Sequence, residues 1–347
     1  MKCSLLTLIF ISLISSFISL KRRINKDLFD EAQAKQYSYL LSKLSCAKSP
    51  INQTCTDCLQ TNDGNKLYYY FQSKRLLKHL YKVMIHLNDN NKKVLITIAG
   101  PSLNNKGYIN YIYTTGFRKN KQYGFKLETE YSRVYFHIIR DKLIKKVKEI
   151  LKTKGKSDYR FDFAGHSIGG SISLLAAYDL IKTGTINQKI HEPKVYTYGQ
   201  LRIGDNNFVK SVSKILTNLF RIVKKDDFII RVPNCYYNKK GSSWKCLQLN
   251  NMSEQIEDPS SNINKYLKEY NTEEGEPNNM EKFKKNMYYS QAFGTLIMYD
   301  EKMEKQVCKA NNNIKEFNSC EENINLPSVF SDDSHLNYFG HKYGYCK

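Results

Sequence analysis

The stretch FDFAGHSIGG, residues 161–170, decides the fold because it joins a predicted strand to a predicted helix through a tight turn. The apolar run YRFDFAG (159–165) predicts a buried strand, and GGSISLLAAYDLIK (169–182) predicts a helix. Ser167 lies at the centre of a Gly-x-Ser-x-Gly pattern between them. Such a short pattern also arises by chance, so the rest of the chain must decide whether Ser167 is more than a small turn residue.

Strands and helices alternate along most of the chain. This alternation predicts an α/β fold with a mostly parallel sheet that is covered by helices on both faces. The further predicted strands are KLYYYFQS (66–73), KKVLITIAG (92–100), KVYTYGQ (194–200) and FRIVKK (220–225), and the further predicted helices are residues 27–43 and 136–153. The helix at 136–153 is amphipathic, and we expect its lysine-rich face to be solvated.

A serine between a strand and a helix is typical of a nucleophile elbow. The glycines two residues on either side of Ser167 would relieve crowding against the neighbouring strand and helix. The start of the helix presents backbone N–H groups to a developing oxyanion, and the N–H of Ile168 is the natural first donor. We therefore predict that Ser167 is a nucleophile.

A serine nucleophile needs an imidazole base and an acid that orients it, in the chain order Ser, Asp, His in such folds. Three histidines follow Ser167. His191 lies between a predicted helix and strand, before any candidate acid, and we expect it at the surface. His335 and His341 both satisfy the chain order.

The acid is expected in a loop that follows a strand. Asp226 and Asp227 both come at the end of the strand in FRIVKKDDFIIRVP (220–233). Asp205, in RIGDNN, is better explained as a turn residue. From position alone, either Asp226 or Asp227 could orient the base.

The N-terminus, MKCSLLTLIFISLISSFISLKRR, has the pattern of a secretory signal peptide over residues 1–20. The rival interpretation is an uncleaved signal anchor, because three basic residues follow the apolar run at once. We expect secretion or a secretory-pathway lumen, with residues 21–347 forming a single domain. A Lys/Asn/Glu-rich stretch at about 236–285 predicts a long surface insertion.

Nine cysteines are present, and Cys3 would leave with the signal peptide. An even number of eight behind a secretory signal predicts four disulfides. The lone CTDC at Cys55 and Cys58 lacks the second pair that a zinc site requires, so it predicts a disulfide. Asn-x-Ser/Thr sequons at Asn52 and Asn251 indicate glycosylation in the same compartment.

The 347 residues carry a net charge of +21 with 41% hydrophobic residues. No nucleic-acid motif accompanies the charge, so we expect no nucleic-acid partner. A solvated basic surface is the preferred explanation, and attraction to anionic lipid is the alternative.

Four separated motifs resemble the secreted fungal-type (class 3) triacylglycerol lipases, and the similarity covers the chain from about residue 35 onward, apart from the insertion. FDFAGHSIGGSISLLAAYDL is similar to the family's elbow and following helix. VYTYGQLRIGDNNFV resembles its YTYGQPRVGNxxFA segment. FRIVKKDDFIIRVP resembles its acid loop, and HLNYFGHKYGYC resembles its terminal HLxYFG segment.

The resemblance implies an α/β-hydrolase fold and a catalytic triad of Ser167, Asp227 and His335. It selects Asp227 over Asp226 and His335 over His341. It also implies a mobile lid, which falls on PSLNNKGYINYIYT (101–114), with an ordinary loop as the alternative.

The resemblance further implies the disulfides Cys46–Cys346, Cys55–Cys58 and Cys308–Cys320. Cys235 and Cys246 would then pair with each other, a pair for which the family offers no counterpart.

The chain departs from the family at the second oxyanion donor, where the family usually has Ser or Thr after the glycine that ends the strand. Here Pro101 follows Gly100, and proline has no N–H. Ser102 would supply the donor if the loop shifts by one residue. Loss of one such donor typically costs about two to three orders of magnitude in rate.

The preferred hypothesis is a triacylglycerol lipase that needs no metal or organic cofactor. It would act as a monomer on lipid esters at an oil–water or membrane interface. The alternatives are a phospholipase or other carboxylesterase, and a catalytically weak lipid-surface protein that kept the fold. Pro101 favours the last alternative, and the complete triad opposes it.

Overall fold

The computed structural model describes residues 29–46, 64–73, 80–101, 117–231, 235–238, 243–246, 294–300, 302–309 and 332–344. The chain divides into two compact units, residues 1–34 and residues 35–347. The first unit is described only at residues 29–34, where a helix begins. The predicted signal peptide, both sequons and the predicted lid from Ser102 onward lie outside the described residues, so these remain predictions, as does the predicted division into domains.

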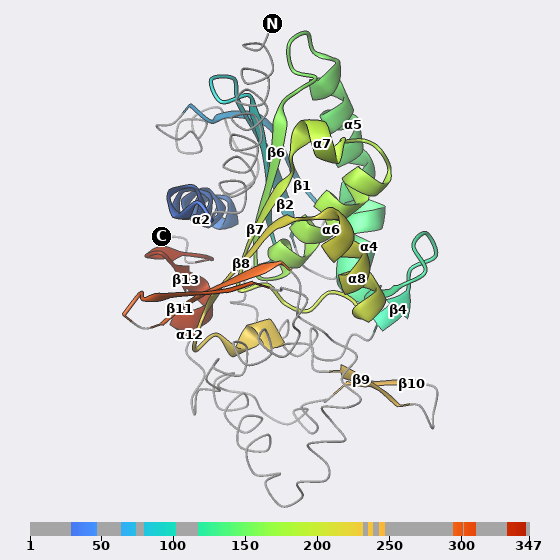
Figure 1. The fold of residues 1–347 in the computed structure, drawn as a ribbon, viewed down its shortest axis with the longest axis vertical. Helices are drawn as coiled ribbons and strands as arrows, with labels where there is room; N and C mark the ends of the chain where they lie inside the picture. The colour runs from blue at the N-terminus through green and yellow to red at the C-terminus, as the bar shows by residue number, and fades with distance from the viewer. Residues whose placement is uncertain are drawn as a thin grey trace, which may run out of the picture. The chain divides into compact units, whose positions relative to one another are not determined.

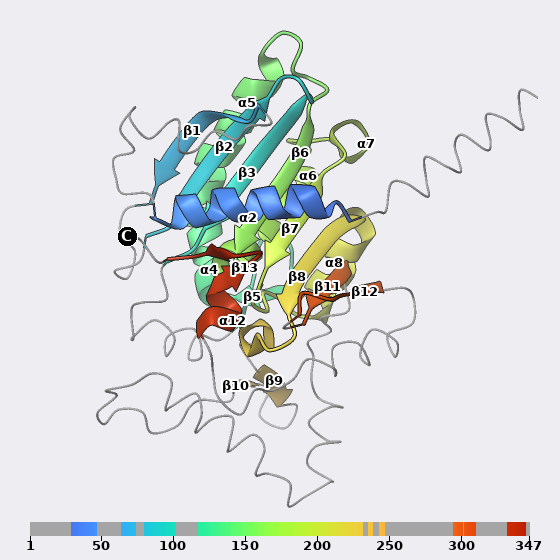
Figure 2. The same cartoon turned by 90° about the vertical axis from the view of Figure 1, so that its left-hand side faces the viewer.

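The second unit is built on one sheet (Figure 1). Its strands follow the order β1-β2-β3-β6-β7-β8-β11-β12, which Figure 2 shows face-on. The strands are β1 (Lys66–Gln72), β2 (Lys82–Asn88), β3 (Lys93–Ala99), β6 (Arg160–His166), β7 (Lys194–Tyr198), β8 (Asn218–Lys224), β11 (Thr295–Tyr299) and β12 (Lys305–Lys309). From β3 to β11 the neighbouring strands are parallel. The predicted strands at 66–73, 92–100, 159–165, 194–200 and 220–225 are therefore confirmed, within two residues at their ends.

Both edges of the sheet are antiparallel. The turn at 89–92 joins β2 to β3, and residues 300–304 join β11 to β12. Links this short reverse the chain direction, whereas a parallel pair needs a long crossover connection. The sheet is thus parallel at its centre and antiparallel at its edges, and the sequence analysis identified neither β2, β11 nor β12 as a strand.

Helices cover both faces of the sheet. Figure 2 shows α2 (Glu31–Cys46) lying across the strands on one face. The other face is covered by α4 (Thr129–Val134), a π-helical turn η3 (Tyr135–Ile139), α5 (Arg140–Lys152), α6 (Ile168–Lys182) and α8 (Asn206–Ile215), as Figure 1 shows. The short helix α7 (Gln188–His191) lies between α6 and β7 in the chain.

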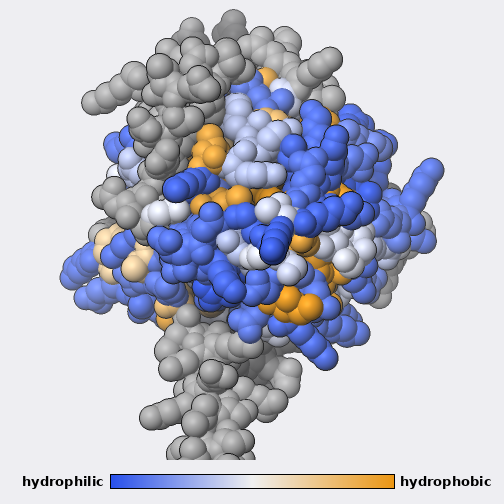
Figure 3. Space-filling view, turned by 90° about the horizontal axis from the view of Figure 1, so that it is seen from above, coloured by the Kyte–Doolittle hydropathy of each residue, from blue (hydrophilic) through white to orange (hydrophobic). Residues whose placement is uncertain are grey.

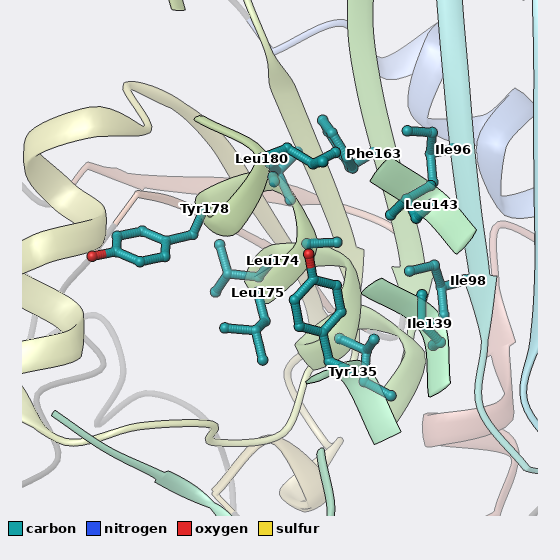
Figure 4. Packing of buried hydrophobic residues seen from close by; sticks show 14 of the residues in the cluster. Ile96, Ile98, Tyr135, Ile139, Leu143, Phe163, Leu174, Leu175, Tyr178 and Leu180 are labelled. Atoms are coloured by element: carbon teal, nitrogen blue, oxygen red, sulfur yellow. The ribbon is translucent and has the colours of Figure 1, made fainter. Parts of the chain in front are cut away.

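The main hydrophobic core lies between the sheet and α5 and α6. Ile96 and Ile98 of β3 face Ile139 and Leu143, while Phe163 of β6 packs toward α6 (Figure 4). Every residue of β3 is buried, as expected for a strand with parallel and helical neighbours. Each such side chain contributes about 1.5–3 kcal/mol on burial, so the core holds the strand ends in place.

The predicted amphipathic helix at 136–153 begins earlier than its apolar periodicity indicates. Helical structure starts at Thr129, where the carboxylate of Glu128 accepts a hydrogen bond from the backbone N–H of Tyr131. The prediction of a solvated lysine face holds only in part. Lys142 and Lys146 of α5 lie over aromatic rings of β1, with Nζ 5.2 and 4.7 Å from the ring centroids.

The face seen from above in Figure 3 is mostly hydrophilic, with hydrophobic side chains gathered in small separate areas. Such scattered apolar exposure is ordinary on a protein surface. Among the residues that the structure describes, no helix has the length and apolar character needed to cross a bilayer.

The predicted insertion at 236–285 is described only as a small hairpin, formed by β9 (Cys235–Asn238) and β10 (Ser243–Cys246). The backbone register places Cys235 opposite Cys246. The rest of the insertion lies outside the described residues. The disulfides expected at Cys46, Cys55 and Cys308 each involve at least one cysteine that is also outside them.

Candidate active site

The candidate nucleophile occupies a strained turn between β6 and α6. Ser167 has φ 56° and ψ −125°, a conformation that non-glycine residues rarely adopt. Its backbone N–H donates to the carbonyl of Tyr198 on β7 at 2.8 Å, which holds the turn against the sheet. Strain of this kind costs about 1–3 kcal/mol and persists where the surrounding structure imposes it.

The glycines of the pattern are required by the close approach of β6, α6 and β3. A Cβ on Gly165 would overlap the carbonyl of Gly169, and a Cβ on Gly169 would overlap the carbonyl oxygen of Ile98. The helix therefore starts directly against two strands. The predicted role of both glycines, relief of crowding on either side of Ser167, is confirmed.

Ser167, His335 and Asp227 form one hydrogen-bonded chain. His335 Nε2 lies 2.9 Å from Ser167 Oγ, and His335 Nδ1 lies 2.9 and 3.0 Å from the two carboxylate oxygens of Asp227. With the proton on Nδ1 donated to the carboxylate, Nε2 is left to accept the serine O–H. All three side chains are buried, so water does not compete for these hydrogen bonds.

The three residues come from the carboxyl ends of strands and from the C-terminal segment. Asp227 follows β8, in a loop where its N–H donates to Lys224 O at 3.1 Å and Lys225 N–H donates to Tyr299 O at 2.8 Å. His335 lies on α12 (Asp332–Leu336), which is followed by a small hairpin of β13 (Asn337–Tyr338) and β14 (His341–Lys342). Parallel strands bring their carboxyl ends to one edge, which is why these distant segments meet there.

Two further groups hold the carboxylate of Asp227. The hydroxyl of Tyr338 donates to Oδ2 at 2.6 Å, and the backbone N–H of Ile229 donates to Oδ1 at 3.1 Å. Burial, followed by the nearby charge of Asp227, raises the pKa of Tyr338 well above its usual value, so its hydroxyl keeps its proton. Sequence reasoning missed Tyr338, although it stands in the HLNYFG motif.

Gly199 is a second residue that sequence reasoning missed. It follows β7 with φ 53°, and a Cβ there would lie 2.7 Å from Asp227 Oδ2 and 3.0 Å from His335 Nδ1. Only glycine leaves room for the acid and the base to meet at this point. The signal available in the sequence was a single glycine near the end of the predicted strand at 194–200.

His166 connects the elbow to the base. Its Nε2–H donates to the backbone carbonyl of His335 at 2.7 Å, and its ring stacks on Tyr343 with centroids 4.0 Å apart. Burial, with a smaller contribution from His335, lowers the pKa of His166 well below its usual value. His166 is therefore a neutral donor at neutral pH.

The remaining candidates from the sequence, Asp205, His191 and His341, lie outside the triad. Asp205 is the N-cap of α8, and its carboxylate accepts a hydrogen bond from Phe208 N–H at 3.0 Å, in line with its predicted turn role. The expectation that His191 lies at the surface is wrong. Its ring is buried at the end of α7, with Nε2 3.1 Å from the carbonyl of Ser157. His341 lies on β14, where its ring meets Tyr39 edge-on, away from the triad.

A small pocket, partly open to solvent, adjoins the candidate nucleophile. Leu41, Ala99, Pro101 and Leu336 give it a largely apolar lining beside Ser167. Ile168 is the first residue of α6. Its backbone N–H therefore has no hydrogen-bond partner within the helix, as for the first residues of any α-helix. Ser102, the expected second oxyanion donor, lies outside the described residues. No cluster of three His, Cys, Asp or Glu side chains in the described ranges could hold a metal ion.

Comparison with known families gives a match to lipase (class 3) over residues 104–237, which contain the elbow and Asp227. This matched part of the chain, less than half of its length, is similar to the class 3 lipases. Phospholipase A(1) DAD1 of Arabidopsis thaliana is 33% identical to this protein over 97 residues, 28% of this chain and 21% of the relative. Triacylglycerol lipase OBL1 of Nicotiana tabacum is 30% identical over 129 residues, 36% of this chain and 20% of the relative.

The match spans about a fifth to three tenths of the length of the curated relatives. Among solved structures, the lipase from Rhizopus microsporus var. chinensis superposes with a TM-score of 0.60 at 20% identity, covering 92% of each chain. At this identity the similarity shows the fold. It confirms the predicted α/β-hydrolase architecture with a mostly parallel central sheet.

Proposed function

We propose that this chain is a secreted serine hydrolase that cleaves carboxylic ester bonds of lipids, with triacylglycerol as its main substrate. The observation that carries the proposal is the hydrogen-bonded chain from Ser167 Oγ through His335 to Asp227, at 2.9 Å and 2.9–3.0 Å. This geometry activates a serine hydroxyl for attack on an acyl carbon. An apolar cavity beside the nucleophile suits a hydrocarbon chain.

In the proposed reaction, Ser167 Oγ attacks the ester carbonyl while His335 Nε2 takes its proton. Asp227 orients the imidazole and stabilises the imidazolium that forms. The imidazolium then protonates the departing alcohol, which leaves an acyl group on Ser167. A water molecule, activated by His335 in the same way, hydrolyses this acyl-enzyme. None of these steps requires a metal or an organic cofactor.

The oxyanion would be held by backbone N–H groups. Ile168 N–H is the proposed first donor, supported by its position at the start of α6. Pro101 lines the cavity beside Ser167 but has no N–H to donate. We assign the second donor to Ser102, one residue further along the loop.

Phospholipid is the second candidate substrate. Several curated relatives are phospholipases A1 by name, including two from Arabidopsis thaliana that match at 26% and 33% identity. The net charge of +21 would also attract an anionic membrane surface.

The proposed route through the secretory pathway is supported by the N-terminal signal pattern and by cysteine chemistry. Disulfides of Cys46 and Cys308, as predicted, would form in such an oxidising compartment. The directly opposed positions of Cys235 and Cys246 in the β9–β10 hairpin favour the predicted pair between them.

The test uses full-length protein secreted from a eukaryotic host, with Ser167→Ala as the matched variant. Both are assayed on a short-chain p-nitrophenyl ester, a triglyceride emulsion and anionic phospholipid vesicles. We expect the parent to hydrolyse triglyceride, and we expect Ser167→Ala to lose about four to six orders of magnitude in kcat.

Faster turnover of phospholipid than of triglyceride would replace the first substrate with the second. Equal activity in the parent and in Ser167→Ala, or no hydrolysis of any of these esters by a folded parent, would overturn the proposed enzyme.

A further inference from the structure

Asp226, the carboxylate next to the acid of the triad, has a partner of its own. The hydroxyl of Ser334 donates a hydrogen bond to Asp226 Oδ2. Ser334 is the residue before the base and is buried, whereas Asp226 is partly exposed. The two neighbours of the triad residues are therefore bonded to each other beside the Asp227–His335 pair. Nothing in the proposed mechanism uses this second pair.

The Asp226–Ser334 and Asp227–His335 pairs have the same sequence separation. Asp226 and Ser334 are 108 residues apart, and so are Asp227 and His335. A slip of one residue between the acid loop and the base segment would bring His335 to Asp226 instead. Because both side chains are carboxylates, their chemistry alone does not decide which one the imidazole meets.

We propose that Ser334 and Asp226 are positioning residues that set this register and leave Asp227 as the acid. The Ser334–Asp226 bond fixes residue 334 against residue 226 and thereby leaves His335 against Asp227. This inference rests on the proposed esterase activity of the same site.

The other side-chain bonds described between residues 226–227 and the base segment do not perform this task. His335 Nδ1 and the Tyr338 hydroxyl both end on the carboxylate of Asp227. They bind the acid but do not occupy its neighbour. The Ser334–Asp226 bond holds the two segments together without drawing on a catalytic group.

The first experiment compares Ser334→Ala, Asp226→Asn and Ser173→Ala with the parent on a p-nitrophenyl ester. Ser334→Ala is expected to lower kcat about ten-fold and leave KM within two-fold. Asp226→Asn keeps an oxygen that accepts from Ser334, so its kcat should stay within about two-fold of the parent. Ser173→Ala removes a buried 2.9 Å hydrogen bond from α6 to the carbonyl of Ala164, and it controls for general destabilisation.

The second experiment repeats Ser334→Ala in an Asp227→Ala background. There, removal of the Ser334 hydroxyl frees Asp226 to orient the base, so the double variant should be at least about three-fold more active than Asp227→Ala alone. Adding Asp226→Asn should abolish this gain. A serine with only a structural role would lower activity in both backgrounds.

The outcomes separate this inference from the function on which it rests. An inactive parent would remove the proposed function before the variants are compared. An active parent with unchanged kcat in Ser334→Ala, or a further loss in the Asp227→Ala background, would overturn the register role and leave the hydrolase in place.

Discussion

The nucleophile and its two partners are positioned by different physical means. Ser167 is held by the backbone: a strained φ of 56°, two glycines without room for a Cβ, and a continuous path from β6 into α6. Asp227 and His335 lie on segments 108 residues apart and are held by side-chain hydrogen bonds from Tyr338, Ser334 and His166. The nucleophile side is thus rigid by sterics, and the acid–base side is assembled by polar contacts.

This difference predicts different consequences of damage on the two sides. A side chain added at the elbow would overlap backbone atoms that cannot move aside, so it should lower the stability of the fold. A substitution near Asp227 or His335 would displace side chains and loops, so it should lower catalytic activity while the hydrophobic core stays folded.

The largest effect is expected at Gly169. Gly169→Ala would drive a Cβ into the backbone of Ile98, between α6 and β3, and should cost more than about 4 kcal/mol of unfolding free energy. Secreted yield and the thermal unfolding midpoint measure this. Gly155→Ala is the control, because nothing lies near a Cβ at Gly155; its positive φ of 80° should cost only about 1 kcal/mol. Similar midpoints for the two variants would contradict the steric account of the elbow.

Gly199→Ala is the corresponding change on the acid–base side. Its Cβ would lie 2.7 Å from Asp227 Oδ2, so the carboxylate must move away from His335. We expect kcat to fall about 100-fold, in line with the cost of a small misplacement in an active site. The unfolding midpoint should change far less than in Gly169→Ala. Full activity of Gly199→Ala would show that the acid loop tolerates displacement.

Tyr338→Phe should have an intermediate effect. It removes the 2.6 Å hydrogen bond to Asp227 and leaves the ring in place. Hydrogen bonds to charged groups contribute about 1.5–3 kcal/mol, so we expect kcat to fall about ten-fold or more with little change in KM. Tyr178→Phe serves as the control, since it loses a 2.7 Å hydrogen bond to Ser211 away from the site and should keep its activity. Equal kcat in both variants would remove Tyr338 from the supports of the triad.

The smallest effect concerns the pH dependence of stability at His166. Its pKa in the folded protein is well below the ordinary value of 6.5, so the unfolded chain binds more protons at acid pH. The stability linked to this residue is present above pH 6.5 and is lost as the pH falls below that value. His166→Gln, which keeps an N–H donor, should therefore lose less stability than the parent between pH 7 and pH 5.5. The difference should be about 1 kcal/mol, measured by urea unfolding. Parallel curves would contradict a neutral, buried His166.

Sequence reasoning was most successful where local pattern and structure coincide. The strands and helix around Ser167 were predicted because apolar runs and glycines act over a few residues. It failed at the sheet edges, where β2, β11 and β12 were not identified, and at His191, where a polar residue between two elements was assigned to the surface. Burial of that histidine depends on packing of α7 against distant residues, which no local pattern contains.

The sequence by itself predicted the alternation of strands and helices, the elbow at Ser167 and, through the family resemblance, the two residues proposed as its partners. Only the tertiary structure decided how Asp227 and His335 are held, that Gly199 must be a glycine, and that Asp226 is bonded to Ser334. The physical reason is that an elbow is made by consecutive residues, whereas an acid and a base from distant segments meet only after the sheet has brought its strand ends together.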